Sequence, residues 1–142
     1  MGYTGGDSRG YWGAAGPPRP GRIEYRLMRE STVREYRKGR LGKPEVCDAQ
    51  SELLRVARNL GRETTTECPI CKDSILVHVS FAFGPGLPAS GRALGPGDLA
   101  TVTRRSGDYE CYVVEVCAAC GWNHLLRMFP VGTSVAKGRA RA

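Results

Sequence analysis

Four cysteines, arranged as two widely separated C-x-x-C pairs, are the residues of this sequence best suited to chemistry. Cys68 and Cys71 form the first pair, and Cys117 and Cys120 form the second. Each pair can supply two sulfurs from one tight turn, and a structural zinc ion takes four such ligands in a tetrahedron. The spacing therefore predicts a single structural Zn²⁺ bound by all four thiolates.

Two disulfides and a redox-active dithiol are the alternative uses of these pairs. A thioredoxin-type C-x-x-C opens a helix after a strand in a βαβ pattern, and that setting is absent around both pairs. The N-terminus lacks the apolar stretch of a signal peptide, and no run approaches the roughly 18 apolar residues of a membrane span. We therefore expect a protein of the reducing cytoplasm, without a membrane partner, where bound zinc is favoured over disulfides.

The remaining candidate residues receive weaker roles. Cys47 and Cys111 lie in regular segments and are expected to be small buried apolar residues. His78 and His124 are expected to stay out of a metal site that four thiolates already close. With only two histidines, no nucleophile, base and orienting group can be assembled, so we do not expect an enzyme.

The basic charge lies mostly outside the segment that holds the cysteines. The chain has a net charge of +7, and residues 19–43 carry nine Arg or Lys against three Glu. Residues 137–141 add three basic side chains, whereas residues 44–136 hold eight basic and ten acidic ones. Such an uneven balance favours an anionic partner, which we expect to be nucleic acid, a ribonucleoprotein such as the ribosome, or RNA polymerase.

A basic helix is predicted over residues 22–38, ended by Gly39. At 100° per residue, four arginines and Val33 fall on one stripe, which could follow a phosphate backbone or could be an ordinary solvated face. Guanidinium groups suit bidentate phosphate contact. Trp122, beside the second pair, could cover the thiolates or contact a partner. The predicted partner-binding residues are Arg22, Arg26, Arg29, Arg37, Arg40 and Trp122.

The other elements complete an α+β fold. A second helix is expected at 49–60, with Asp48 as its N-cap and a stripe of apolar residues along one face. Residues 62–67 are interpreted as a polar connector, and 84–97 as a loop. Clean alternation predicts a strand at 75–83 with one buried face, and further strands are expected at 109–116 and 125–131. One or two helical turns are expected over 98–105.

The predicted architecture is an N-terminal helical hairpin followed by a zinc ribbon with a three-stranded antiparallel sheet. The hairpin occupies residues 22–61 and the ribbon 62–132. A disordered tail at 1–21 and a basic flexible tail at 133–142 flank them.

Several short motifs, taken together, resemble a family of small actinobacterial proteins of unknown function. They are the runs 45–49 and 53–57, the first cysteine pair with its proline, and the runs 112–117 and 120–125. The resemblance covers residues 23–132 and implies the helix pair and zinc ribbon without implying an activity. Cys111 stands where an apolar or aromatic residue is expected, so we leave it out of the metal site.

These observations favour a non-enzymatic zinc-ribbon protein that docks through its basic helix on nucleic acid or on a nucleoprotein machine of transcription or translation. A protein-only adaptor, for example one associated with RNA polymerase, is the main alternative. A thiol sensor that loses zinc on oxidation is a third possibility. No small-molecule substrate is inferred.

Overall fold

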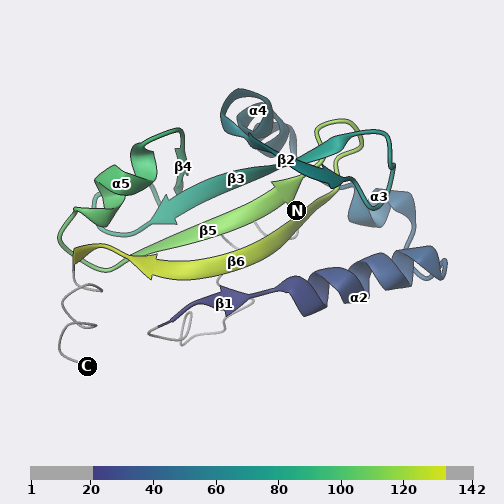
Figure 1. Cartoon of the computed structure of the whole chain (residues 1–142), viewed down its shortest axis with the longest axis horizontal. Coiled ribbons are helices and arrows are strands. Elements are labelled where there is room, and N and C mark those ends of the chain that lie inside the picture. The colour runs from purple at the N-terminus through teal and green to yellow at the C-terminus, as the bar shows by residue number, and fades with distance from the viewer. Residues whose placement is uncertain (1–20, 134–142) are drawn as a thin grey trace.

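A six-stranded antiparallel sheet forms the centre of the computed structural model, which describes residues 21–133 (Figure 1). The strand order is β1-β6-β5-β3-β2, and β4 pairs with β3 beside β2. The strands are β1 (Ile23–Glu24), β2 (Arg62–Glu67), β3 (Ile75–Phe83), β4 (Arg92–Leu94), β5 (Tyr109–Val116) and β6 (Asn123–Val131). The two predicted tails lie almost wholly outside the described residues.

Four helices accompany the sheet within the described residues. They are α2 (Arg26–Arg37), α3 (Lys43–Val46), α4 (Ser51–Leu60) and α5 (Asp98–Thr103). None of the helices in this part of the chain is both long and apolar enough to cross a membrane.

The α+β class is confirmed, and the strands predicted at 75–83 and 109–116 have the observed bounds. The three-stranded ribbon is not confirmed, because β1, β2 and β4 extend the sheet to six strands. Residues 62–67, interpreted as a connector, form β2 instead. Their side chains are nearly all exposed, so this edge strand shows no apolar alternation that sequence reasoning could detect.

The predicted helical hairpin is also not confirmed. Helix α2 packs against β6 and α3, whereas α4 packs against β3 and β4. Figure 1 shows α2 and α4 at opposite edges of the sheet. The N-terminal end of the predicted first helix is wrong, because Ile23 and Glu24 pair with Met128 and Arg127 of β6.

Tyr25 makes the transition from this strand to α2. Its N–H donates to the Leu126 carbonyl at 2.8 Å, and its side chain is buried against Tyr112 and Met128. Pairing with a strand distant in sequence therefore overrides the helical period of residues 22–25.

Both faces of the sheet are covered, although only one buried face was expected for β3. Leu53 and Ala57 of α4 pack on Val79 and Phe81, which share one face. The opposite face is covered at its two ends. Near the cysteine pairs, Leu76 packs with Val33 of α2 and with Trp122. At the far end, Ala82 packs with Val102 of α5.

Candidate metal centre

The four cysteines of the two C-x-x-C pairs converge at one end of the sheet. Their sulfur atoms all lie within 4.8 Å of one another. The Cys68 and Cys120 sulfurs are 3.7 Å apart, as are those of Cys71 and Cys117. Four sulfurs held tetrahedrally about 2.3 Å from a zinc ion would be separated by about 3.8 Å. The cluster therefore has the dimensions needed to hold a metal ion.

The two pairs are built as matching turns. The residue after each second cysteine has a positive φ, 59° for Lys72 and 92° for Gly121. The Lys72 N–H donates to the Cys68 carbonyl at 3.1 Å, and the Gly121 N–H donates to the Cys117 carbonyl at 2.9 Å. Each turn is thus closed by the same bond, and both sulfurs of a pair point to one side.

Backbone N–H groups also point at the cysteine sulfurs. Ile70 N–H approaches Cys68 Sγ at 3.4 Å, and Cys120 N–H approaches Cys117 Sγ at 3.5 Å. Such donors stabilise the thiolate, which is the form that binds metal. Hydrogen bonding of this kind in both turns supports a site organised for thiolate ligands.

Burial has the opposite effect on two of the four thiols. It raises the pKa of Cys68 and of Cys120 to about 12, chiefly because a thiolate is poorly solvated there. Four thiolates at this spacing would also repel one another. A bound cation offsets the poor solvation of the thiolates and their mutual repulsion. The cysteines are therefore expected to lose their protons when the metal binds.

Cys47 is a fifth sulfur at the edge of the cluster. Its thiol lies 3.4 Å from Cys120 Sγ, and it packs against the core around Trp122. Cys47 was expected to be a small buried apolar residue, but it is only partly buried. Its position beside a candidate ligand was not foreseen, because no spacing rule relates it to either C-x-x-C pair.

The backbone after Cys47 braces the second turn. Ala49 N–H donates to the Gly121 carbonyl at 3.0 Å, and Asn123 Nδ2 donates to Asp48 Oδ1 at 2.9 Å. Asp48 is therefore not the N-cap of α4, a position held by Gln50.

A buried carboxylate links α2 to the second cysteine turn. Glu115 Oε2 accepts from Arg29 Nε at 2.6 Å and from Trp122 Nε1 at 2.7 Å. The side chains of Glu115 and Arg29 are only 5% and 18% exposed. Sequence reasoning missed Glu115, although an acid between Val114 and Val116 in a mostly apolar strand is a signal that a cation must be buried with it.

The predicted partner-binding residues separate into two groups. Arg26, Arg37 and Arg40 are exposed, and Arg40 pairs with Glu35 at 3.1 Å. Arg22 is exposed but lies before β1 rather than on α2, and its Nε donates to Glu24 at 2.5 Å.

Arg29 and Trp122 do not belong to an exposed stripe. Arg29 is held by Glu115, and Trp122 is 1% exposed, with its ring stacked on His124 at a centroid distance of 5.8 Å. Val33, in the middle of the stripe, is buried, so the middle of this side of α2 faces the protein, whereas Arg26 and Arg37 toward its two ends stay exposed. Trp122 thus packs in the core beside the cysteine cluster.

Cys111 is fully buried in β5, as expected, and burial raises the pKa of its thiol to about 12. The two histidines flank Glu115 in the sheet register, and burial lowers the pKa of each imidazole. The cluster of metal-ligating side chains found within residues 21–133 contains cysteines alone.

Comparison with known proteins confirms the expected resemblance to an actinobacterial family. A model of a family of unknown function, DUF5318, matches residues 19–142. Similar proteins include the uncharacterised proteins Rv0049 of Mycobacterium tuberculosis and Mb0050 of Mycobacterium bovis. Each is 40% identical over 113 residues, which cover 79% of this chain and 82% of the relative. No solved structure matches the chain.

Proposed function

We propose that this chain, which belongs to the DUF5318 family, is a non-enzymatic zinc module that docks on nucleic acid or on a nucleoprotein through the arginines of α2. The observation that carries the proposal is the cluster of four cysteine sulfurs in two matching turns, beside which α2 is fixed. Thiolate ligands at this spacing favour Zn²⁺ over the hard cations Ca²⁺ and Mg²⁺, which take oxygen ligands.

The metal in this proposal has a structural role. Four thiolates fill a tetrahedral zinc ion and leave no open position for a substrate or an activated water. When bound, the ion supplies a crosslink between the two cysteine turns. This crosslink also fixes the position of α2, because its Val33 packs in one core with Cys68, Cys117 and Trp122.

The proposed docking surface is the exposed side of α2 and the turn after it, namely Arg26, Arg34, Arg37 and Arg40. Arg26 and Arg37 are 11 residues apart, which separates them by roughly 16 Å along the helix axis. Arg34 and Arg37 line a hollow of about 270 Å³ together with Pro69 of the first cysteine turn. Arg34 and Arg37 of the docking surface therefore lie beside the first cysteine turn, in a hollow that Glu30 also lines.

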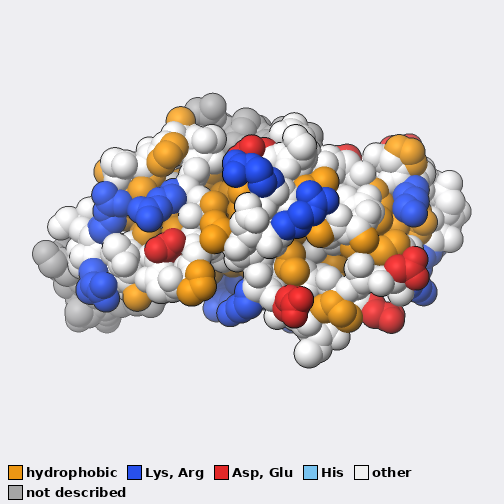
Figure 2. Space-filling view, turned by 90° about the horizontal axis from the view of Figure 1, so that it is seen from above, with side chains coloured by type: hydrophobic (Ala, Val, Ile, Leu, Met, Phe, Trp, Pro, Cys, Tyr) orange, Lys and Arg blue, Asp and Glu red, His pale blue; other side chains and the backbone are white. Residues whose placement is uncertain are grey.

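The opposite edge of the protein is a poorer candidate. Figure 2, seen from the side on which α4 lies in Figure 1, shows separate groups of Lys and Arg with acidic and hydrophobic side chains between them. Arg55 on α4 is paired with Glu52. A phosphate backbone is neutralised by a row of cations, and α2 offers Arg26, Arg34 and Arg37 in such a row, although Arg40 after the helix is paired with Glu35.

The test measures binding of the zinc-loaded protein to labelled duplex DNA and to labelled RNA over a range of salt concentrations. The double variant R26A/R37A should reduce the slope of log affinity against log salt by about 2, because each phosphate contact contributes about 0.9. The matched control R55A/R58A removes two exposed arginines of α4 and should leave the slope unchanged. An equal slope for wild type and R26A/R37A would refute docking through α2.

A further inference from the structure

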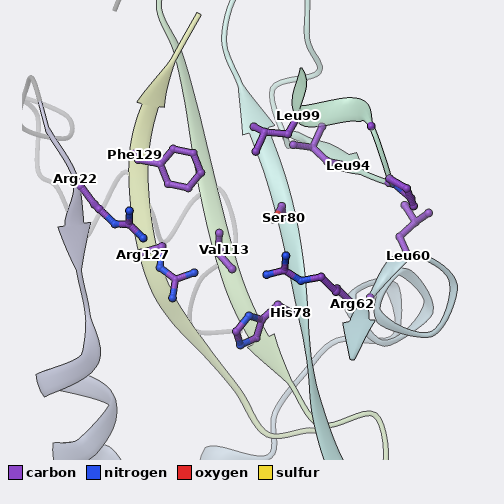
Figure 3. A pocket seen from close by; sticks show the side chains of 14 residues that line it. Arg22, Leu60, Arg62, His78, Ser80, Leu94, Leu99, Val113, Arg127 and Phe129 are labelled. Atoms are coloured by element: carbon purple, nitrogen blue, oxygen red, sulfur yellow. The ribbon is translucent and has the colours of Figure 1, made fainter. Parts of the chain in front are cut away.

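A second cavity lies on the face of the sheet between the α2 end and the α5 end, away from the cysteines. Its volume is about 670 Å³, within the range of small-ligand sites. Its floor is formed by β3, β5 and β6 and its rim by Arg22, by the end of α4 and by the loop before α5 (Figure 3). This cavity is the part of that face which neither α2 nor α5 covers.

One end of the cavity is cationic. The guanidinium groups of Arg62 on β2, Arg127 on β6 and Arg22 before β1 point toward one another over the sheet (Figure 3). No carboxylate is among the cavity-lining residues within the described ranges. Glu24, outside the lining, approaches Arg22 at 2.5 Å and Arg127 at 3.6 Å. Arg62 is therefore the cation that an incoming anion meets without competition from that carboxylate.

Two buried nitrogen atoms in the lining lack a hydrogen-bond partner in the part of the chain that the structure describes. They are His78 Nδ1 and Arg127 Nε, of which the latter has only the 3.6 Å ion pair with Glu24 Oε1. A buried polar atom without a partner costs about 1–3 kcal/mol, and such atoms are usually satisfied by water or by a ligand. Both atoms lie at the cationic end, so the oxygen atoms of a ligand bound at this end could form hydrogen bonds with them.

The other end of the cavity is apolar. Leu94, Leu99 and Phe129 lie there, and Leu60 closes the side (Figure 3). Leu60 and Leu99 are 37% and 40% exposed, and are thus two of the five large hydrophobic side chains that the described surface exposes. Exposed leucines that line a cavity are what an apolar ligand group would cover.

We propose that this cavity binds a nucleoside monophosphate, with the phosphate at Arg62 and Arg127 and the base against Leu94 and Leu99. Three arginines suit a phosphate, which carries close to two negative charges, better than a single carboxylate. A fatty acid would leave the buried nitrogens at the cationic end only partly satisfied, and its flexible chain lacks a rigid shape for the apolar end. The ribose then lies between the two ends, beside Ser80, while His78 Nδ1 belongs to the phosphate end.

The ligand can be a free nucleotide or the 5′-phosphorylated end of an RNA strand, since both present the same phosphate and base. The proposal does not depend on docking through α2, because its residues belong to β2, β3, β4, β6 and α5.

Isothermal titration calorimetry of the full zinc-loaded chain tests the proposal. The probes are the four ribonucleoside 5′-monophosphates, the matching nucleosides and inorganic phosphate. At least one monophosphate should bind ten-fold or more tightly than both its nucleoside and inorganic phosphate. Failure of all four to do so would overturn the proposal.

Variants locate the binding. R62A should weaken the monophosphate at least ten-fold, and L99E, which places a carboxylate at the exposed rim, should do the same. R58A on α4 is the matched control for the loss of an exposed arginine and should have no effect. Binding that R62A and L99E leave unchanged would lie elsewhere and contradict the proposal. R26A/R37A should not alter it, which separates this site from the docking surface.

A pair of tetraribonucleotides, with and without a 5′-phosphate, distinguishes the two sources. Tighter binding of the phosphorylated strand than of the monophosphate identifies an RNA end as the ligand. Tighter binding of the monophosphate identifies a free nucleotide.

Discussion

Replacement of Glu115 by alanine should be among the most destabilising single changes outside the cysteines. The carboxylate is 5% exposed and accepts two hydrogen bonds, from Arg29 at 2.6 Å and from Trp122 at 2.7 Å. Its loss leaves the guanidinium of Arg29, 18% exposed, and the buried indole N–H without their acceptor. Removing one partner of a buried ion pair typically costs about 3–5 kcal/mol, so E115A should lose stability of that order.

Urea denaturation at a fixed excess of zinc, followed by tryptophan fluorescence, measures this loss. With a slope of about 1–3 kcal/mol per molar urea, the midpoint should fall by about 1–5 M. E52A is the control, because Glu52 is 69% exposed and pairs with Arg55 on the surface of α4. That pair should contribute no more than about 0.5 kcal/mol. Similar midpoints for E115A and E52A would refute the role given to the buried carboxylate.

Three further predictions concern His78 in the cavity and Gly121 and Cys47 beside the cysteine cluster. Burial lowers the pKa of His78 in the folded state below the unfolded-state pKa of about 6.5. The neutral ring therefore contributes stability above about pH 6.5, and this stability is lost as the pH falls through the folded-state pKa of His78. Wild type should therefore lose more stability than H78Q between pH 7.5 and pH 5.5 at saturating zinc, and equal losses would contradict this. G121A should lower the free energy of unfolding by about 1–3 kcal/mol, which is more than the effect of G39A. Both glycines have a positive φ, but only at Gly121 would an added Cβ meet another atom, the Cys47 carbonyl oxygen at 3.0 Å. Equal costs in thermal unfolding would mean that Cys47 does not pack on this turn. C47S should still bind one metal ion per chain, whereas C71S should not; loss of metal from C47S would make Cys47 a ligand.

The cysteine pairs and the central strands could be predicted because their signals are local. C-x-x-C spacing constrains two ligands within one turn, and alternation over nine residues constrains a strand. Both depend on neighbours in sequence, which is why β3 and β5 have the expected bounds.

The errors lie where distant pairing decides the structure. Residues 22–25 have a helical period, yet Ile23 pairs with Met128, which is more than 100 positions later in the chain. Arg29 belonged to the predicted arginine stripe, but it is the partly buried partner of Glu115, 86 residues away. A helical projection assigns charged residues to the solvent-exposed side of a helix. It cannot show that one of them is partly buried because it pairs with a residue on another element.

The same limit applies to the nucleotide cavity and to Cys47. Arg62, Arg127 and Arg22 come from three segments with no common motif, and the sheet register alone brings them together. Cys47 reaches Cys120 across 73 residues because the backbone at Ala49 bonds to Gly121.

Metal content of the purified protein tests the central claim most directly. Zinc should be present at one ion per chain by inductively coupled plasma mass spectrometry, and X-ray absorption should show four sulfur neighbours at about 2.3 Å. Chelation should unfold the chain, because metal binding and folding share one free energy in sites of this kind. A metal-free protein that unfolds cooperatively at the same temperature with and without zinc would contradict the account.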